Sequence, residues 1–268
     1  MFNRLAWCCA PLAILGALMV AASAADAQDG RPTVSAFIED IGPRFTSNAF
    51  LSEKNAQSDV FVAPATGVGV SGLFAQGLAY SFSAAMVNTR YRRFSELDDD
   101  TAVLAASVAY TRGPWTLAAE YSPKWVYTRE FGALSAELHD WTASVKGAFK
   151  WSGVALSPVF SVRRRASDVD LVENTRLGAG VGIAWKPSER GLLKVAPGVT
   201  YTIYDASPAA GIDRKDLWAG VNVDYIHSLT SSADLVLSVG VGYNDSTVPG
   251  RSWRSFGASP SLSLSTKF

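Results

Sequence analysis

The chain has 268 residues, and its 24 lysines and arginines balance its 24 aspartates and glutamates. A chain without excess positive charge is not typical of nucleic-acid-binding proteins, so the composition indicates no nucleic-acid partner. Its two cysteines, Cys8 and Cys9, stand together near the start. The residues after them have no disulfide to hold them and depend on packing and backbone hydrogen bonds.

Residues 1–27 have the pattern of a secretory signal peptide. Arg4 gives a positive start, residues 5–25 are nearly all apolar, and Ala25-Asp26-Ala27 matches a small-residue cleavage site. We expect cleavage near Ala27, a short stub at residues 28–32, and one domain at residues 33–268. A single membrane anchor is the alternative, because the apolar run is long enough to span a bilayer. The small residues at its end and the lack of a positive flank after it favour the signal peptide.

From residue 33 onward, apolar and polar side chains alternate, which is the pattern of β-strands with a different environment on each face. No later stretch approaches the roughly 18 uninterrupted apolar residues of a transmembrane helix. A closed barrel is the other way to span a bilayer, because every backbone N–H and C=O there needs a partner. The alternation predicts twelve strands, at residues 33–45, 59–73, 78–93, 101–111, 115–129, 141–151, 154–165, 176–186, 193–203, 216–229, 235–244 and 258–268.

The connections between these segments alternate in length. Long polar loops follow the odd segments and short turns follow the even ones. This asymmetry is typical of a membrane barrel with short periplasmic turns and longer outer loops, and an even strand number places both termini of the barrel domain on the periplasmic side. Outward aromatic residues gather near both ends of the segments, as expected for the two interfacial girdles.

A secreted β-sandwich or lipocalin-like barrel is the soluble alternative, since its strands also alternate. Its exposed face would carry charges and its buried face would be apolar. Here the apolar face is almost uncharged, and the other face is dominated by Gly, Ser, Thr and Ala with scattered Lys and Arg. This distribution favours a wet interior surrounded by lipid.

The segment at residues 258–268 alternates apolar residues with serines and ends on the aromatic residue Phe268. It resembles the closing strand of bacterial outer-membrane β-barrels, whose C-terminal aromatic residue belongs to the signal that the barrel assembly machinery recognises. The resemblance implies a bacterial outer-membrane location, contact with outer-membrane lipid, and a role for Phe268 as assembly signal. The expected fold is all-β, a transmembrane antiparallel up-and-down barrel of about twelve strands. Ten or fourteen strands remain open, because the first segment is the least regular.

The predicted interior carries more cations than anions. Basic residues on the inward face are Lys124, Lys146, Lys150, Arg163, Arg165, Arg176, Lys186, Lys194 and Lys267. Acidic residues on that face are Glu39, Glu120 and Asp224. Cations lining a pore favour the passage of anions. The alternative of equal weight is that these groups pair internally and plug a narrow barrel, since a shift of one residue in a strand reverses its assignment.

Twelve strands and a basic interior resemble the small monomeric porins that admit oligogalacturonate or sialic acid. The resemblance covers residues 33–268 and includes no diagnostic motif. It implies a monomeric channel for passive diffusion of small polar, preferentially anionic solutes, without a cofactor and without enzymatic activity.

Two other functions remain as alternatives. Outer-membrane phospholipases, lipid A deacylases and omptin-type proteases share the architecture and need a His beside Ser, Asp or Asn. His139, expected next to Asp140 in an outer loop, and His227, expected to face lipid, are the available histidines, and no dedicated metal site is expected from two of them. The other alternative is a structural or adhesive barrel that does not conduct.

Overall fold

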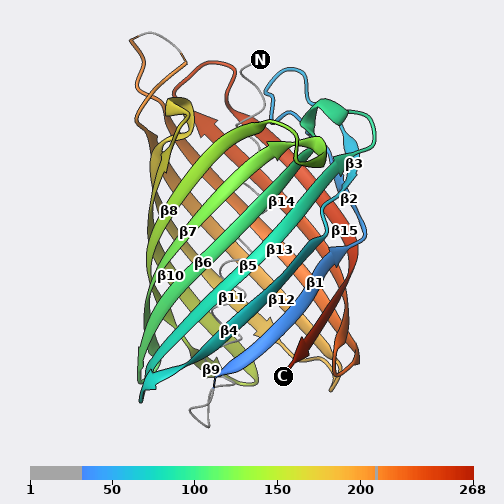
Figure 1. Cartoon of the computed structure of the whole chain (residues 1–268), viewed down its shortest axis with the longest axis vertical. Helices are drawn as coiled ribbons and strands as arrows, with labels where there is room; N and C mark the ends of the chain where they lie inside the picture. The colour runs from blue at the N-terminus through green and yellow to red at the C-terminus, as the bar shows by residue number, and fades with distance from the viewer. Residues whose placement is uncertain (1–31, 209–210) are drawn as a thin grey trace.

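The computed structural model describes residues 32–208 and 211–268, which form a closed antiparallel β-barrel (Figure 1). Twelve strands make up the wall, because β1 with β2, β3 with β4, and β8 with β9 each form one interrupted strand. The elements are β1 (Thr33–Ile41), β2 (Pro43–Thr46), β3 (Asp59–Val62), β4 (Ala65–Ala75), β5 (Leu78–Tyr91), β6 (Asp99–Arg112), β7 (Trp115–Thr128), β8 (Leu134–Gly147), β9 (Phe149–Trp151), β10 (Val154–Ser167), β11 (Asn174–Trp185), β12 (Gly191–Tyr204), β13 (Lys215–Thr230), β14 (Ala233–Ser246) and β15 (Trp253–Lys267).

The predicted fold class and strand number are confirmed. Strands that follow one another in the chain pair antiparallel, and β1 pairs with β15 to close the barrel, with Ser35 opposite Lys267. Closure leaves no sheet edge, so the backbone hydrogen bonds of the wall are satisfied within it. Among the described residues, no helix is long and apolar enough to cross a membrane.

Long loops gather at one end of the barrel and tight turns at the other (Figure 1). The loop end carries three short 3-10 helices, η1 (Ser95–Leu97), η2 (Arg129–Phe131) and η3 (Asp170–Val172). At the turn end, β6 and β7 are joined by two residues, Gly113 and Pro114, and β13 and β14 by Ser231 and Ser232. The observed alternation of loop length agrees with the prediction and gives the barrel two different ends.

The outer surface carries the large apolar side chains. Trp151 is 73% exposed and Phe160 is 58% exposed, although both lie within strands. Buried apolar residues form only small clusters, such as Val126, Ala136 and Leu138 near the loop end. A protein with its apolar residues outside cannot be stabilised by a central core, so the closed hydrogen-bond ladder is a main source of stability.

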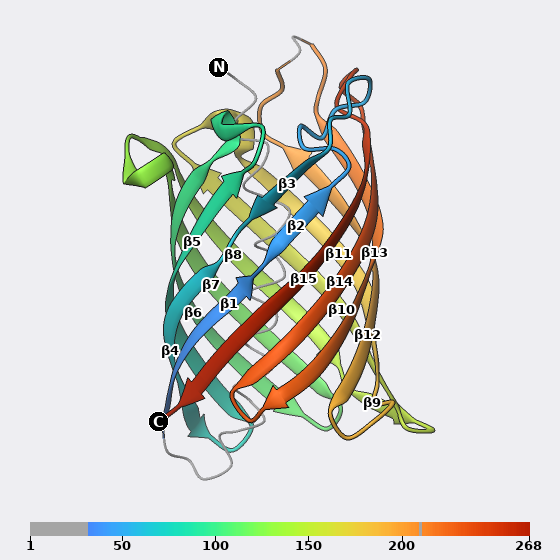
Figure 2. The ribbon, with the colours of Figure 1, turned by 90° about the vertical axis from the view of Figure 1, so that its right-hand side faces the viewer.

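The wall is interrupted where β1 passes into β2 (Figure 2). Asp40 has a positive φ of 59°, and the register against β15 shifts between Ile38 and Ile41. A Cβ on Gly42 would lie 2.2 Å from the carbonyl oxygen of Pro260, so only glycine fits there. Prolines have no N–H to donate to the ladder, and Pro260 sits opposite this interruption. The first strand, expected to be irregular, is therefore broken by a bulge.

Some strand boundaries differ from the expectation. The sixth strand begins at Leu134, and β15 begins at Trp253, so both extend further toward the loops than predicted. His139 and Asp140 consequently lie inside β8, and their assignment to an outer loop was wrong. The predicted signal peptide and most of the stub lie outside the described residues.

Candidate functional site: a charged interior wall

One carboxylate on the inner side of the barrel contacts three cations from neighbouring strands. Asp140 on β8 accepts hydrogen bonds from Arg165 on β10, with Nε–Oδ1 and Nη2–Oδ2 distances of 2.7 Å. Lys124 on β7 donates to Oδ2 at 2.8 Å, and Arg163 Nε lies 3.8 Å from Oδ1. The Asp140 and Arg165 side chains are 4% and 1% exposed. Three positive charges thus share one negative charge in the loop-side half of the barrel.

Arg163 on β10 also lies next to a second arginine on the adjacent strand, β11. It lies directly opposite Arg176 on β11, and its Nη2 donates to Asn174 Oδ1 at 3.0 Å. The Nε of Arg176 is buried and has no hydrogen-bond partner among the described residues. Like charges directly opposite each other on adjacent strands are unfavourable. The positive charge therefore extends from Lys124 on β7 to Arg176 on β11.

Glu120 on β7 interacts electrostatically with Lys124 and Asp140. Counting this acid, the loop-side group consists of four cations and two carboxylates, which leaves two formal positive charges. The cations are Lys124, Arg163, Arg165 and Arg176, and the carboxylates are Glu120 and Asp140. We call these six residues the upper cluster.

The turn-side half of the interior is more nearly balanced. Lys194 on β12 lies directly opposite Asp224 on β13. Lys146 and Asp234 also interact electrostatically with Lys194. Two cations and two carboxylates therefore form a second group, which we call the lower cluster.

The remaining predicted site residues lie apart from both clusters. Lys150, Lys186 and Lys267 are exposed at the turn end. Glu39 lies beside the bulge in β1, close to the ion pair between Arg44 and Asp40. That any of these residues lines a water-filled passage stays a prediction.

Phe268 has an 80% exposed side chain, and its backbone N–H donates to the carbonyl of Val34 at 2.9 Å. The contact extends the pairing of β15 with β1 by one residue. Its role in assembly also stays a prediction.

Beside the upper cluster, four glycines on adjacent strands form part of the inner surface, which we call the glycine wall. Gly180, Gly198, Gly220 and Gly242 lie side by side on β11 to β14. The ring of Trp218 lies over two of them, because Cβ atoms on Gly220 and Gly242 would be 2.4 and 2.8 Å from its atoms. The absence of side chains at these positions leaves room for the indole ring on the inner surface.

Asp140, Asp216 and Asp234 were missed as inward acids. Asp216 accepts hydrogen bonds from Arg214 at 2.7 Å and from Ser246 at 2.6 Å. For Asp140 the signal was present in the sequence: the alternation that puts Trp141 outside continues back through His139, which places Asp140 inside. The interior is therefore less basic than the sequence count predicted.

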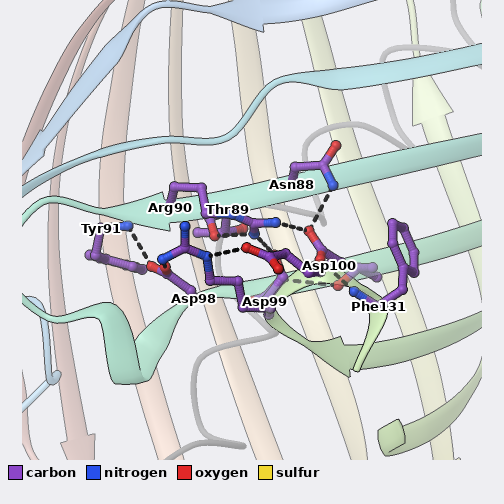
Figure 3. Close-up of polar contacts among 11 residues, drawn as sticks. Asn88, Thr89, Arg90, Tyr91, Asp98, Asp99, Asp100 and Phe131 are labelled. Carbon is purple, nitrogen blue, oxygen red and sulfur yellow. Dashed lines mark hydrogen bonds and ion pairs between the residues drawn. The ribbon is translucent and has the colours of Figure 1, made fainter. Parts of the chain in front are cut away.

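Acidic residues at the loop end are engaged with protein groups (Figure 3). Asp100 accepts from Asn88 Nδ2 at 2.7 Å, from Arg90 Nη2 at 2.6 Å and from the Phe131 backbone N–H at 2.9 Å. Asp98 accepts from the Tyr91 backbone N–H at 2.7 Å. No group of three metal-ligating side chains is found in residues 32–208 and 211–268. The carboxylates of this rim fasten η1 and η2 to the strands.

The two histidines have aromatic neighbours. His139 stacks on Tyr121 and Trp141. Its Nδ1 forms a hydrogen bond of 2.8 Å with the Tyr121 hydroxyl, and its Nε2 lies 3.2 Å from Glu137 Oε1. His227 stacks on Tyr225 near the turn end. Neither arrangement places a serine nucleophile beside the imidazole.

Comparisons with known proteins show the fold and leave the function open. No family model and no curated protein matches the chain. An outer-membrane channel from Pseudomonas putida F1 is similar with a TM-score of 0.57 and 12% identity, over 90% of this chain and 99% of that one. A bacterial polysaccharide outer-membrane secretin has a TM-score of 0.53 and 8% identity, over 86% and 97%. LpxR from Salmonella typhimurium matches at a TM-score of 0.46 and 10% identity, over 87% and 99%. The first two matches show that the chain shares its β-barrel fold with these outer-membrane proteins.

Proposed function

We propose that this protein is a bacterial outer-membrane channel for the passive diffusion of small polar solutes, with a preference for anions. The upper cluster carries the proposal. Four cations share two carboxylates there, and Arg163 and Arg176 face each other directly. Unbalanced positive charge on an inner wall raises the local concentration of anions.

The glycine wall supports a passage rather than a filled barrel. Bulky inward side chains would be needed to fill the barrel, and the neighbouring positions Gly180, Gly198, Gly220 and Gly242 supply none. In this proposal the solute passes the upper cluster and the adjacent glycine wall, beside the ring of Trp218.

Planar-bilayer recording of the purified barrel tests the proposal. We expect stepwise conductance and, in a potassium chloride gradient, a reversal potential that indicates chloride preference. Conductance with cation preference would refute the role of the upper cluster, and conductance at background would refute the channel.

A non-conducting structural or adhesive barrel is the second candidate. The burial of Arg165 and Asp140 favours it, because ions packed against one another are poorly available to a solute. Absence of conductance with normal insertion would support this candidate. A membrane-embedded lipid hydrolase has less support, since His139 and His227 stack with aromatic residues and lack a nucleophile.

The proposal includes export through a signal peptide cleaved near Ala27, assembly through recognition of the last strand with Phe268, and function as a monomer. It requires no cofactor and no metal. Release of a precursor segment on export, detected by mass spectrometry of the membrane-bound protein, tests the first of these points.

A further inference from the structure

The outer surface of the barrel has an apolar groove across six strands, from β15 back to β10. It is a broad, shallow depression, and its lining is almost entirely apolar. A row of directly opposed residues follows it: Arg254, Tyr243, Ala219, Val199, Ala179 and Phe160. The small side chains of Ala219 and Ala179 lie between larger neighbours and deepen the surface.

The groove runs from the loop end of the barrel toward its middle. Arg254 is the second residue of β15 counted from the loop end, whereas Phe160 is the seventh of the fourteen residues of β10. Figure 2 shows the strands from β12 to β15 side by side on this wall. The row therefore begins at the height of lipid headgroups and ends at the height of lipid chains.

Arg254 differs from Arg90 and Arg164, two other arginines of the loop-side half. Arg90 is paired with Asp100, and Arg164 forms a bidentate pair with Asp205, whose carboxyl pKa is lowered by the hydrogen bonds from Arg164. Arg254 lies 5.4 Å from the ring centre of Tyr243 and has no carboxylate partner among the described residues. An unpaired arginine on a lipid-facing wall is unfavourable unless the membrane supplies its counter-ion.

We propose that this groove binds an anionic lipid of the loop-side leaflet, with its phosphate at Arg254 and one acyl chain along the row toward Phe160. Charge complementarity and the apolar lining together select this occupant. The proposal rests on membrane insertion of the barrel, which is part of the proposed function, and it does not require conductance.

Fluorescence quenching at the groove tests this proposal. Cys8→Ser and Cys9→Ser remove the native thiols, so that a fluorophore can be attached at Ala219→Cys alone. The labelled barrel is inserted into phosphatidylcholine vesicles that contain a minority of a lipid with brominated, quenching chains. This brominated lipid is phosphatidylglycerol in one preparation and phosphatidylcholine in the other. We expect the fluorophore to contact brominated phosphatidylglycerol about fivefold more often than brominated phosphatidylcholine. This ratio is the preference for an anionic lipid that one basic side chain near the membrane surface provides. Added salt should reduce the difference.

Matched controls separate the groove from general attraction. Arg254→Gln should abolish the preference, whereas Arg112→Gln, at the turn end of β6, should preserve it. A fluorophore at Val108→Cys, on the outer side of β6, should show no preference. If Ala219→Cys does not fold, Val199→Cys in the same row replaces it with the same expectation.

Equal quenching by the two brominated lipids would overturn the proposal. If neither brominated lipid quenched the fluorophore and the protein formed concentration-dependent dimers, the lipid-binding proposal would be overturned. A second copy of the chain would then cover this face. Conductance recorded on the same samples keeps the outcomes apart, because a barrel that inserts and fails to conduct still reports on the groove.

Discussion

Arg163 and Arg176 lie directly opposite each other on adjacent strands, and Arg163 shares its carboxylate, Asp140, with two further cations. Opposed like charges reduce stability by up to about 1 kcal/mol. A protein that keeps such a pair on its inner wall retains positive charge that its own carboxylates do not neutralise.

Replacing Arg176 should weaken anion preference without unfolding the barrel. In water, a unit charge about 4 Å away changes the energy of an ion by about 1 kcal/mol, so Arg176→Ser should lower the ratio of chloride to potassium permeability by up to about fivefold. Reversal potentials in a salt gradient measure the ratio. Arg112→Ser, which removes an exposed charge at the turn end, should leave it unchanged. An equal effect of both substitutions would show that selectivity is set by overall charge.

Asp140→Asn should destabilise the barrel and raise its anion preference. The substitution leaves Lys124, Arg163 and Arg165 without their shared counter-ion, and breaking a buried ion pair costs about 3–5 kcal/mol. Urea unfolding in lipid vesicles, followed by tryptophan fluorescence, measures the loss. The exposed carboxylate Asp245 provides the comparison, since Asp245→Asn should change stability by less than about 0.5 kcal/mol. Unchanged stability of Asp140→Asn would mean that the three cations do not depend on this acid.

Gly42→Ala should impair closure of the barrel. The new Cβ would collide with the Pro260 carbonyl, and backbone atoms cannot move aside as a flexible side chain can. We expect the free energy of unfolding to fall by about 1–3 kcal/mol. In unheated samples on electrophoresis, less protein should run as the compact, heat-modifiable folded form. Gly182→Ala is the matched control, because its Cβ would find its nearest atom at an ordinary 3.5 Å. Similar behaviour of the two variants would count against a tight seam at Gly42.

Trp218→Ala should increase single-channel conductance. The indole ring lies over Gly220 and Gly242 on the inner surface, so its removal widens the passage beside the glycine wall. Single-channel recording measures the change. Trp185→Ala removes a ring of equal size from the outer surface, where Trp185 is 50% exposed, and should not alter conductance. A conductance that responds to neither substitution would place the narrowest point elsewhere.

Period-two alternation was sufficient to predict the wall wherever a strand is regular. Leu177 and Trp185 are exposed on the outer face, as expected, because β11 has no bulge. Prediction was poorer where the backbone departs from regular geometry. Asp40 has a left-handed conformation that no short-range pattern indicates, and it breaks the first strand.

The upper cluster was only partly predictable for a different reason. Lys124, Arg163, Arg165, Arg176 and Glu120 were assigned inward from alternation alone. Asp140, the common partner of Lys124, Arg163 and Arg165, was placed in a loop, because polar residues were taken to end the strand before Trp141. The register between neighbouring strands determines which cations share a carboxylate. A single sequence does not reveal this register.

The closing pair of strands sets the order in which the barrel forms. Most of the wall joins strands that follow one another in the chain, and hairpins of that kind form early because little chain entropy is lost. Ser35 meets Lys267 only after the intervening strands are in place. The bulge at Asp40 and the donor-free Pro260 interrupt that last ladder, so closure lacks the cooperativity of the other pairings. We therefore expect the slow step of folding to be the joining of β15 to β1.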